Sequence, residues 1–226
     1  NTNSRFGHIR KEHEARQNLG YKSELYDSKS VRSIIGSAEY RGGVRYPDTF
    51  GINSFLYCQA LRDILANQGV KIYEQTSAID IKEGRVTTEL GSVSADFTIV
   101  CADRFIPDLG RMEKEIYHVQ TFLGISKPLR NGDMAKIFPK NKMMVWDTDL
   151  VYNYFRATGQ NRLLIGGGDL FYTYAHSVSH NTERFKKRLT KYIEKKFPSL
   201  NIELEYVWPG MLGVSKDLLP VMDFDS

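Results

Sequence analysis

Five segments that read as strands with mixed faces, between Ile116 and Trp208, constrain the fold more than any other feature of the sequence. They cover residues 116–125, 143–146, 151–156, 162–165 and 202–208. Strands with mixed faces predict an antiparallel sheet in which one face is covered and the other face lies over a cavity. A helical pattern at 179–197 interrupts the set and is ended by Pro198. Its large apolar residues fall on one side of the helix and are Phe185, Leu189, Ile193 and Phe197.

The residues before this sheet predict three helices. Two shorter helical segments are expected at 9–19 and from Ser28, where they serve as connectors. A stronger helix ends at Gly69 and carries a single apolar stripe, which predicts that it packs on a sheet. The candidate N-terminal caps are Asp27 or Ser28 for the second helix and Asn53 or Ser54 for the third.

A β-meander is predicted after the third helix. Short runs at 70–73, 78–81 and 86–90, and one from Val93, are separated by glycine-containing turns. The next run, Phe97 to Ala102, is continuously apolar, which is typical of a strand covered on both faces. We therefore predict an α+β fold in which a parallel strand, of the kind found in nucleotide-binding sheets, accompanies the meander and the antiparallel sheet.

Composition and charge exclude several classes of protein. The charged fraction of 26% and the hydrophobic fraction of 41% are those of a globular domain, so disorder is not expected. No window approaches the roughly 18 apolar residues of a membrane span. The basic run at 186–196 avoids the apolar stripe of its helix, which favours a solvated face over a nucleic-acid surface. Cys58 and Cys101 have no CxxC spacing and read as reduced structural thiols, which points to the cytoplasm.

Three local patterns resemble functional motifs but are incomplete. His176 and His180 have helical spacing for a metal, yet no acidic or cysteine partner accompanies them, so no metal site is predicted. The glycine run at 166–168 lacks the lysine of a phosphate loop and reads as a turn or a close-packed strand end. No GxSxG elbow is present, which argues against hydrolase chemistry.

An aromatic and polar cluster on neighbouring predicted strands is the strongest indication of a site. Phenol, indole and guanidinium groups each need a polar partner when they are removed from water, so they are costly in a core. Their clustering fits the wall of a binding cavity. In an alternative interpretation Arg156 pairs with Asp147 and simply ties two strands together. The residues are Trp146, Asp147, Tyr152, Tyr154, Arg156 and Trp208.

Three stretches together resemble the flavin-dependent amine and amino-acid oxidases grouped with D-amino-acid oxidase and glycine oxidase. They lie at 41–76, at 121–167 and at 197–221, where the last contains Tyr206-Val207-Trp208-Pro209-Gly210 and Ser215-Lys216-Asp217-Leu218-Leu219-Pro220. The second and third look closest to the gamma-glutamylputrescine oxidase branch. The resemblance implies an FAD-dependent enzyme that oxidises the C–N bond of a small amine or amino acid to an imine.

The resemblance also implies a division of the chain and a set of site residues. It implies a helical connector at 1–38, a partial FAD-binding domain at 39–110, a substrate-binding sheet at 111–210 and a return toward the FAD domain at 211–226. The pocket would be shaped by Tyr152, Tyr154, Arg156 and Trp208. The cofactor-facing positions would be Thr76, Ala78, Cys101, Ala102, Asp103, Gly210, Ser215, Lys216 and Asp217.

Departures from the family's pattern refine these expectations. Asp103 stands where a glycine is usual, and Leu212 stands where glycine oxidase-like members place an arginine on the substrate carboxylate. An amine, or a substrate with a remote carboxylate that Arg156 could meet, therefore fits better. Gly210 occupies the position of the flavin-attaching cysteine of sarcosine oxidase-like members, which implies non-covalent FAD. The same departures leave open a non-catalytic module that binds or senses a small molecule.

The sequence reads as an internal piece of a longer protein. It opens at Asn1 without methionine, the run at 218–222 reads as a strand leading onward, and neither glycine-rich FAD-binding segment of the family is visible. We expect the isolated chain to be inactive and unable to hold FAD tightly. Exposed faces and strand edges left by such a cut predict a homodimer or local disorder near 1–38 and 70–110.

Overall fold

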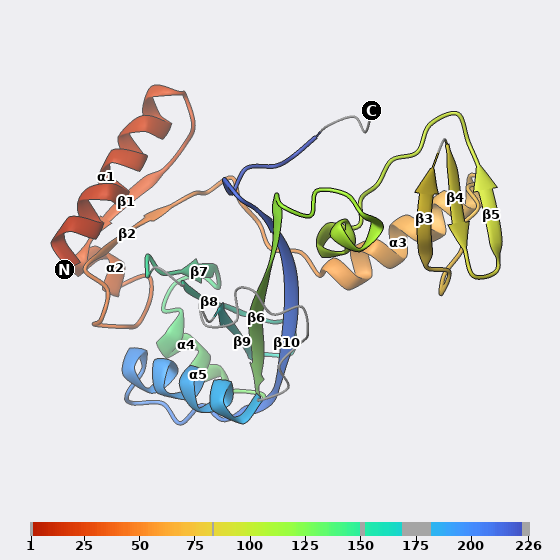
Figure 1. Cartoon of the computed structure of the whole chain (residues 1–226). Coiled ribbons are helices and arrows are strands. Elements are labelled where there is room, and N and C mark those ends of the chain that lie inside the picture. Colours follow the sequence, from red (N-terminus) through yellow and green to blue (C-terminus); the bar gives the residue numbers. More distant parts are fainter. Residues whose placement is uncertain (1, 83, 150–151, 169–181, 223–226) are drawn as a thin grey trace. The chain divides into compact units, whose positions relative to one another are not determined.

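The computed structural model describes residues 2–82, 84–149, 152–168 and 182–222, which form two compact units. Unit 1 contains residues 1–50 and 120–210, and unit 2 contains residues 51–119 and 211–226. Figure 1 shows the elements of both units, and each unit is described by itself below. Both are built from helices and mainly antiparallel strands, which confirms the predicted α+β class.

A five-stranded sheet with the order β10-β6-β9-β8-β7 organises unit 1. Antiparallel ladders join β6 to β9, β9 to β8 and β8 to β7, as the mixed-face strands predict. The strand bounds agree with the predicted segments to within a few residues at most ends, although β10 runs further than expected. They are β6 Ile116–Ser126, β7 Met144–Trp146, β8 Asn153–Ala157, β9 Leu163–Gly168 and β10 Leu204–Ser215.

One face of this sheet is covered by helix α5, Thr182–Lys196. The predicted stripe is buried, and the ring of Phe185 stacks on that of Phe122 with centroids 3.3 Å apart. Gly124 gives α5 room, because a Cβ there would lie 3.3 Å from a methyl carbon of Leu189. Fully packed cores of this kind supply most of a domain's stability. The buried cluster contains Ile35, Met134, Ile137, Phe138, Phe155, Leu163, Ile165, Leu189, Ile193, Phe197, Leu200, Ile202 and Leu204.

Helix α4, Asn131–Ile137, also packs into this core and is missed by the sequence analysis. It has seven residues and buries two of them, Met134 and Ile137. Two apolar residues three apart are too few to define a helical period, so the pattern gives no signal.

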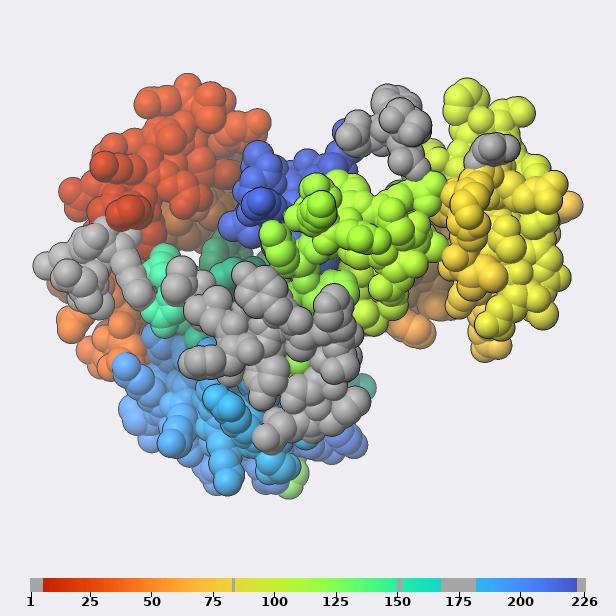
Figure 2. Space-filling view, viewed as in Figure 1, coloured from red at the N-terminus to blue at the C-terminus, as the bar shows by residue number. Residues whose placement is uncertain are grey.

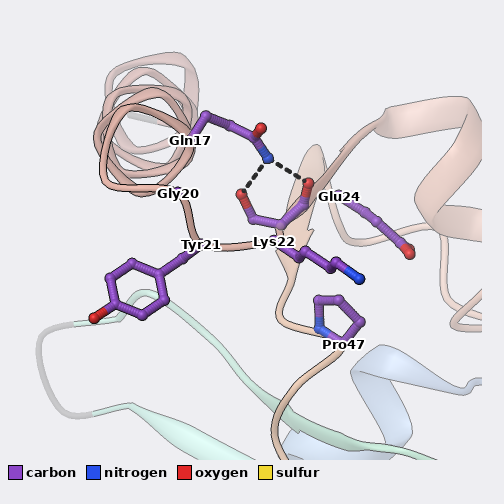
Figure 3. Close-up of a pocket in the computed structure, with 7 residues that line it drawn as sticks. Gln17, Gly20, Tyr21, Lys22, Glu24 and Pro47 are labelled. Carbon is purple, nitrogen blue, oxygen red and sulfur yellow. Dashed lines mark hydrogen bonds between the residues drawn. The ribbon is translucent and has the colours of Figure 1, made fainter.

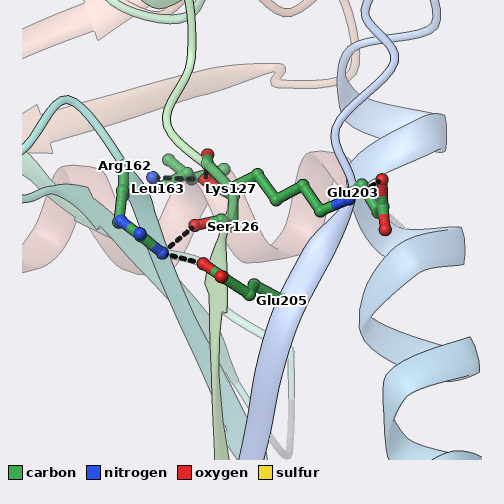
Figure 4. Close-up of polar contacts among 6 residues, drawn as sticks. All are labelled: Ser126, Lys127, Arg162, Leu163, Glu203 and Glu205. Atoms are coloured by element: carbon green, nitrogen blue, oxygen red, sulfur yellow. Dashed lines mark hydrogen bonds and ion pairs between the residues drawn. The ribbon is translucent and has the colours of Figure 1, made fainter.

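A polar corner ties strands β6, β9 and β10 at one end of the sheet (Figure 4). The Leu163 N–H donates to Ser126 Oγ at 2.8 Å, and Arg162 Nη1 donates to the Ser126 carbonyl at 3.2 Å. Arg162 also pairs with Glu205 of β10. An outer pair, Lys127 with Glu203 at 2.9 Å, is solvent-exposed and adds little. The corner therefore holds register mainly through Arg162 and Ser126.

The N-terminal segment of unit 1 contains α1, Thr2–Asn18, and α2, Ser28–Arg32. The Asp27 side chain accepts the Ser30 N–H at 2.7 Å and so caps α2, as predicted. An unpredicted antiparallel pair is formed by β1 Glu24–Asp27, which precedes α2, and β2 Gly42–Arg45, which follows it. The pair joins segments separated by 14 residues, and four-residue strands carry too little alternation to be recognised.

Unit 2 contains α3, Ser54–Asn67, and the predicted meander, β3 Ala78–Lys82, β4 Arg85–Thr88 and β5 Gly91–Ser94. The meander strands pair in the order β3-β4-β5, and Gly84 and Gly91 at the turns adopt positive φ. Asn53 caps α3 through the Leu56 N–H at 3.2 Å, and Gly69 follows the helix with φ +87. All four residues of β5 are exposed, and the meander (yellow) lies on the surface in Figure 2.

Several predictions for unit 2 are wrong for this chain. Helix α3 buries none of its residues, so its apolar stripe does not pack on a sheet among the described residues. The runs at 70–73, 97–102 and 218–222 form no strand, and Phe97 and Ile99 are 89% and 87% exposed. A strand requires a neighbouring strand for its ladder of backbone hydrogen bonds, and none of these runs joins one of the three sheets that the described residues form.

The two thiols also differ from their predicted environments. Cys58 on α3 and Cys101 in the 97–102 run are both exposed free thiols. The buried strand predicted around Cys101 is therefore wrong.

Small helical turns at Asp103–Phe105 (η1) and Pro107–Leu109 (η2) complete the set of elements. No helix in the described parts of the chain is both long enough and apolar enough to cross a lipid bilayer.

Candidate active site

The face of the five-stranded sheet opposite α5 carries the aromatic and polar residues singled out in the sequence. On β8, Asn153 and Phe155 are buried on the covered side, so Tyr154 and Arg156 point to the other side because strand side chains alternate. Both are half-buried. We call this second side the open face and define it by Trp146, Tyr154, Arg156, Tyr206 and Trp208.

Strand register brings several of these residues together. Tyr154 is directly opposite Trp146 of β7 and Gly166 of β9. A Cβ built on Gly166 would lie 2.3 Å from Tyr154 Cζ, so the phenol ring lies over this glycine. Tyr152 also contributes, since its ring centroid is 6.0 Å from that of Tyr154. The glycine run predicted as a close-packed strand end is thus the floor under Tyr154.

Trp208 lies on the same open face at the other edge of the sheet. Val207 packs against Gly124 on the covered side, which turns Trp208 and Tyr206 to the opposite side. These two are 39% and 61% exposed. Trp208 and Tyr154 are separated by three strand spacings, about 14 Å. The two rings can therefore contact opposite ends of one small molecule but cannot act on one atom.

The charges of the open face favour a polar or anionic group beside the tyrosines. Arg156 stands opposite Met144 and Leu164 and adds a guanidinium to an otherwise aromatic and apolar row. Burial, and then the neighbouring Tyr152, raise the pKa of Tyr154, so its phenol stays protonated near neutral pH and can donate a hydrogen bond. The pairing of Arg156 with Asp147 stays a prediction.

One neighbour of the open face could not be found from the sequence. The ring centroid of Tyr46, which follows β2, is 6.2 Å from that of Trp146. Arg16 of α1 stacks over the Tyr46 ring with Cζ 4.2 Å from the centroid. Tyr46 and Trp146 are 100 residues apart, so no local pattern signals their contact. These rings extend the aromatic surface beyond strand β7.

A separate hollow of about 350 Å³ lies beside the end of α1 (Figure 3). Gln17 Nε2 donates to the Ser23 carbonyl at 3.1 Å, and Glu24 pairs with Arg45 at 3.1 Å. The polar groups that line this hollow are therefore already hydrogen-bonded or ion-paired within the protein, which is typical of a turn stabilised by side chains. Its lining residues are Gln17, Gly20, Tyr21, Lys22, Ser23, Glu24 and Pro47.

The residues expected to face a cofactor lie in unit 2, apart from Gly210 of β10. Asp103 has φ +48, a left-handed conformation that glycine adopts more easily, and its Oδ1 accepts the Gly213 N–H at 3.1 Å. A Cβ on Gly213 would lie 2.8 Å from the Arg104 backbone nitrogen. The carboxylate thus stabilises a glycine-like turn, and Gly213 allows β10 to approach it closely.

The remaining members of this set are placed at turns. The Thr76 hydroxyl donates to the Glu74 carbonyl at 2.9 Å, and Ala78 opens β3. The Lys216 N–H donates to the Glu115 carbonyl at 2.9 Å. Ser215 Oγ donates to the Leu219 carbonyl at 2.6 Å, and Asp217 accepts the Leu219 N–H at 3.0 Å. Cys101 and Ala102 precede η1, and Gly210 is exposed on β10 beside Thr121.

Histidine and acidic groups give no second centre in the described parts of the chain. His176 and His180 lie outside the described residues, as do all residues from 169 to 181 between β9 and α5. Among the residues that are described, His, Cys, Asp and Glu form no group of three that could hold a metal ion.

Comparison with known proteins assigns the family. The family model for FAD-dependent oxidoreductases (DAO) matches residues 2–226, which is nearly the whole chain. The chain belongs to the DAO family of FAD-dependent oxidoreductases. This confirms the resemblance seen in the three sequence stretches.

Relatives and solved structures agree with this assignment. The chain is 26% identical over 223 residues to a probable oxidoreductase OrdL of Haemophilus influenzae, covering 94% of this chain and 49% of that protein. It is 24% identical over 205 residues to the gamma-glutamylputrescine oxidoreductase of Escherichia coli, covering 87% and 46%. The chain therefore spans about half the length of the curated relatives it matches.

Among solved structures, glycine oxidase from Geobacillus kaustophilus superposes with a TM-score of 0.75 at 16% identity, covering 94% of this chain and 56% of that one. L-proline dehydrogenase from P. horikoshii superposes with a TM-score of 0.77 at 18% identity, covering 94% and 58%. At these identities the likeness shows that the DAO fold is shared.

The DAO family uses FAD, whose pyrophosphate needs a cradle of free hydrogen-bond donors. The side-chain oxygens of Thr76, Ser215 and Asp217 are engaged within their own turns. The space that Gly213 leaves is filled by the backbone of η1, not left for a ligand. Among the residues that the structure describes, these positions therefore do not by themselves fit the pyrophosphate of FAD.

Proposed function

We propose that the whole protein oxidises the C–N bond of an amine or N-substituted amino acid to an imine, with non-covalent FAD as the electron acceptor. The single observation that carries the substrate side is the open face, on which Trp146, Tyr154, Arg156 and Trp208 point to the same side of one rigid sheet. Membership of the DAO family supports the redox chemistry. The role of this chain is to bind and orient the substrate.

The open face suits an elongated substrate with an apolar or cationic body and a polar end. Aromatic rings at Trp146, Tyr154 and Trp208 attract alkyl chains and cations through their faces. Arg156 would receive a carboxylate or amide oxygen remote from the reacting nitrogen, and the protonated Tyr154 phenol would donate a hydrogen bond. Leu212, in place of an arginine, argues against a clamp on the carboxylate of a simple α-amino acid.

The deciding experiment is anaerobic bleaching of the whole protein by a panel of polyamines, acylated amines and N-methylated amino acids. Yellow protein that loses its flavin absorbance with one class of amine supports the proposal. Colourless protein that still binds amines in a thermal-shift assay would instead support the alternative, a binding or regulatory module.

The substitution Arg156→Ala tests the substrate end within the same panel. We expect KM for carboxylated or acylated amines to rise roughly 10- to 100-fold, since a charge-assisted hydrogen bond contributes about 1.5–3 kcal/mol. Simple diamines should change little. Arg130→Ala is the matched control, because Arg130 is an exposed arginine paired with Asp133 beside α4. Unchanged kinetics of Arg156→Ala across the panel would remove this residue from the site.

The isolated chain is expected to bind FAD weakly, because its described residues provide no phosphate cradle. Titration of the chain with FAD, followed by flavin fluorescence, should give a dissociation constant above about 10 μM, corresponding to less than about 7 kcal/mol of binding. Submicromolar binding would contradict this part of the proposal.

A further inference from the structure

The loop between β7 and β8 joins two residues of the open face and is closed by one aspartate. Asp147 directly follows Trp146, and its backbone N–H donates to the Asn153 carbonyl at 2.9 Å. Its side-chain Oδ1 accepts the N–H groups of Asn153 at 3.0 Å and Asp149 at 3.3 Å. One residue thus fixes both ends of the loop that carries Tyr152, through backbone and side chain together.

A half-buried group of two aromatic rings and one lysine lies within the electrostatic reach of this carboxylate. Lys196, at the end of α5, has Nζ 4.1 Å from the ring centroid of Tyr40 and 5.4 Å from that of Tyr192. The hydroxyl groups of these two tyrosines are 3.3 Å apart. Such a cation between two aromatic rings is attracted by both faces. The group consists of Tyr40, Tyr192 and Lys196.

The electrostatics show that Asp147 belongs to this group. Burial lowers the pKa of Lys196, and the negative charges of Asp147 and Glu39 partly offset that effect. Burial, then the neighbouring Tyr40 and then Asp147, raise the pKa of Tyr192. Asp147 Oδ2 is buried. A buried carboxylate oxygen is costly unless a nearby positive charge compensates it, and Lys196 supplies that charge.

We propose that Asp147 is a positioning residue for the open face: its hydrogen bonds to Asn153 and Asp149 hold Trp146 and Tyr152 in place, and the positive charge of Lys196 compensates its carboxylate. Its effect on substrate preference rests on the proposed function. Its effect on Trp146 does not, and can be measured on this chain alone.

The alternative is that Asp147 contributes only general stability to unit 1. Any destabilising substitution would then have the same consequences for the open face. The distinguishing readout is local, because a positioning residue alters the environment of Trp146 while the fold persists. The chain has two tryptophans, Trp146 and Trp208, so Trp208→Phe makes Trp146 the sole reporter.

In the Trp208→Phe background we compare Asp147→Ala and Asp147→Asn by acrylamide quenching and near-UV circular dichroism. Trp146 is already 47% exposed, so Asp147→Ala should raise the quenching constant by at most about twofold and weaken the near-UV signal. Asp147→Asn keeps an oxygen that can accept the Asn153 N–H, so it should have a smaller effect. The matched control is Asp133→Ala, which removes another paired aspartate of unit 1.

An unchanged Trp146 signal in folded Asp147→Ala overturns the proposal, as does an equal change in Asp133→Ala. Where Asp147→Ala fails to fold, Lys196→Met replaces it, because it removes the compensating charge without touching the loop. Lys196→Met should then shift the Trp146 signal in the same direction, and an unchanged signal again overturns the proposal.

In the whole protein, Asp147→Asn should raise KM about 5- to 10-fold with kcat within about twofold, because binding geometry and not chemistry is disturbed. Asp133→Ala should leave both constants unchanged. If the whole protein oxidises no amine, the proposed function fails while the Trp146 measurement still decides the role of Asp147. If it does oxidise amines and KM is unmoved, the effect of Asp147 on substrate preference is overturned.

Discussion

Helices α5 and α3 are amphipathic helices of nearly equal length, 15 and 14 residues, and they occupy opposite environments. On α5 the stripe residues Phe185, Leu189 and Ile193 are at most 2% exposed, whereas Ile64 of α3 is 53% exposed. Both stripes were predicted from the same periodicity. The difference shows that an apolar stripe predicts a helix and which of its faces is apolar. It does not predict whether another part of the chain packs against that face.

The partner of α5 is supplied by strands on both sides of it in the sequence. Phe122 precedes Phe185 of α5 by 63 residues and Leu204 follows the helix, and both are fully buried against its face. Helix α3 has no comparable surface among the described residues of unit 2, whose meander leaves β5 entirely exposed. Burial of apolar surface, at roughly 25 cal/mol per Å², therefore stabilises α5 and not α3.

The largest expected difference between α5 and α3 is the loss of unfolding free energy when one residue of each apolar stripe is replaced by alanine. Phe185→Ala should destabilise unit 1 by about 3–5 kcal/mol, because it removes a stacked, fully buried ring. Leu61→Ala on α3 should cost less than about 1 kcal/mol. Urea unfolding measures both, with tryptophan fluorescence for unit 1 and far-UV circular dichroism for α3. Equal costs would mean that α3 is packed in solution.

The next largest expected difference is in how the stability of the two units depends on pH. Burial raises the pKa of Tyr40 and Tyr192 above the ordinary value of 10.0. Below pH 10 both phenols are protonated in folded and unfolded chains, so nothing is lost. Above it the unfolded chain releases protons that the folded one keeps, and stability falls by up to about 1.4 kcal/mol per pH unit for each tyrosine.

The measurement is urea unfolding of unit 1 at several pH values above 10.5. Lys196, whose pKa burial lowers, acts in the opposite direction only below its ordinary value of 10.5. Tyr192→Phe should make the slope shallower without abolishing it, because burial also raises the pKa of Tyr40, Tyr46 and Tyr154 in unit 1. Tyr73→Phe, at an exposed position of unit 2, serves as the control. A slope that Tyr192→Phe leaves intact would contradict the assignment.

An effect of intermediate size is expected when either of two glycines, Gly213 or Gly166, is replaced by alanine. A Cβ on Gly213 meets the backbone of Arg104 at 2.8 Å, and backbone cannot move aside, so Gly213→Ala should cost about 1–3 kcal/mol in unit 2. A Cβ on Gly166 meets the outer end of the Tyr154 ring, which can swing away. Gly166→Ala should therefore cost less than about 1 kcal/mol but displace Tyr154 from the open face.

These two variants are measured by thermal unfolding and, in the whole protein, by KM. We expect Gly213→Ala to lower the midpoint more than Gly166→Ala, and Gly166→Ala to raise KM more than its loss of stability explains. The reverse order of midpoints would mean that η1 moves more easily than the Tyr154 ring.

The sequence analysis succeeded where the interaction is local or periodic. The caps at Asp27 and Asn53, the turn at Gly69 and the stripe of α5 depend on residues within a few positions of one another, and all are confirmed. The shared side of Tyr154 and Arg156 also follows, because alternation is a property of the strand that carries both.

It failed where the outcome depends on a distant partner. The 97–102 run has the composition of a buried strand, but composition cannot say whether neighbouring strands are present. The contact of Tyr46 with Trp146 and the lysine behind Asp147 join segments more than 45 residues apart, and neither leaves a local signal. Asp103 was identified as a departure from glycine, and only the structure shows that its carboxylate stabilises the glycine-like turn.

The smallest expected effect concerns the exposed apolar residues of unit 2. Phe97 and Ile99 are nearly fully exposed and lie two positions apart in a segment that forms no strand. The double substitution Phe97→Ser and Ile99→Ser should change the free energy of unfolding by less than about 0.5 kcal/mol, since no contact is lost. It should nevertheless weaken self-association of the chain several-fold, by roughly 1 kcal/mol, because two exposed apolar side chains can pack against a second copy. Sedimentation velocity over a range of concentrations measures this, with Leu90→Ser as the control at an equally exposed turn position. A chain that is monomeric at every concentration before substitution would show that the uncovered side of unit 2 is tolerated in water, and the contrast between α3 and α5 would then concern stability alone.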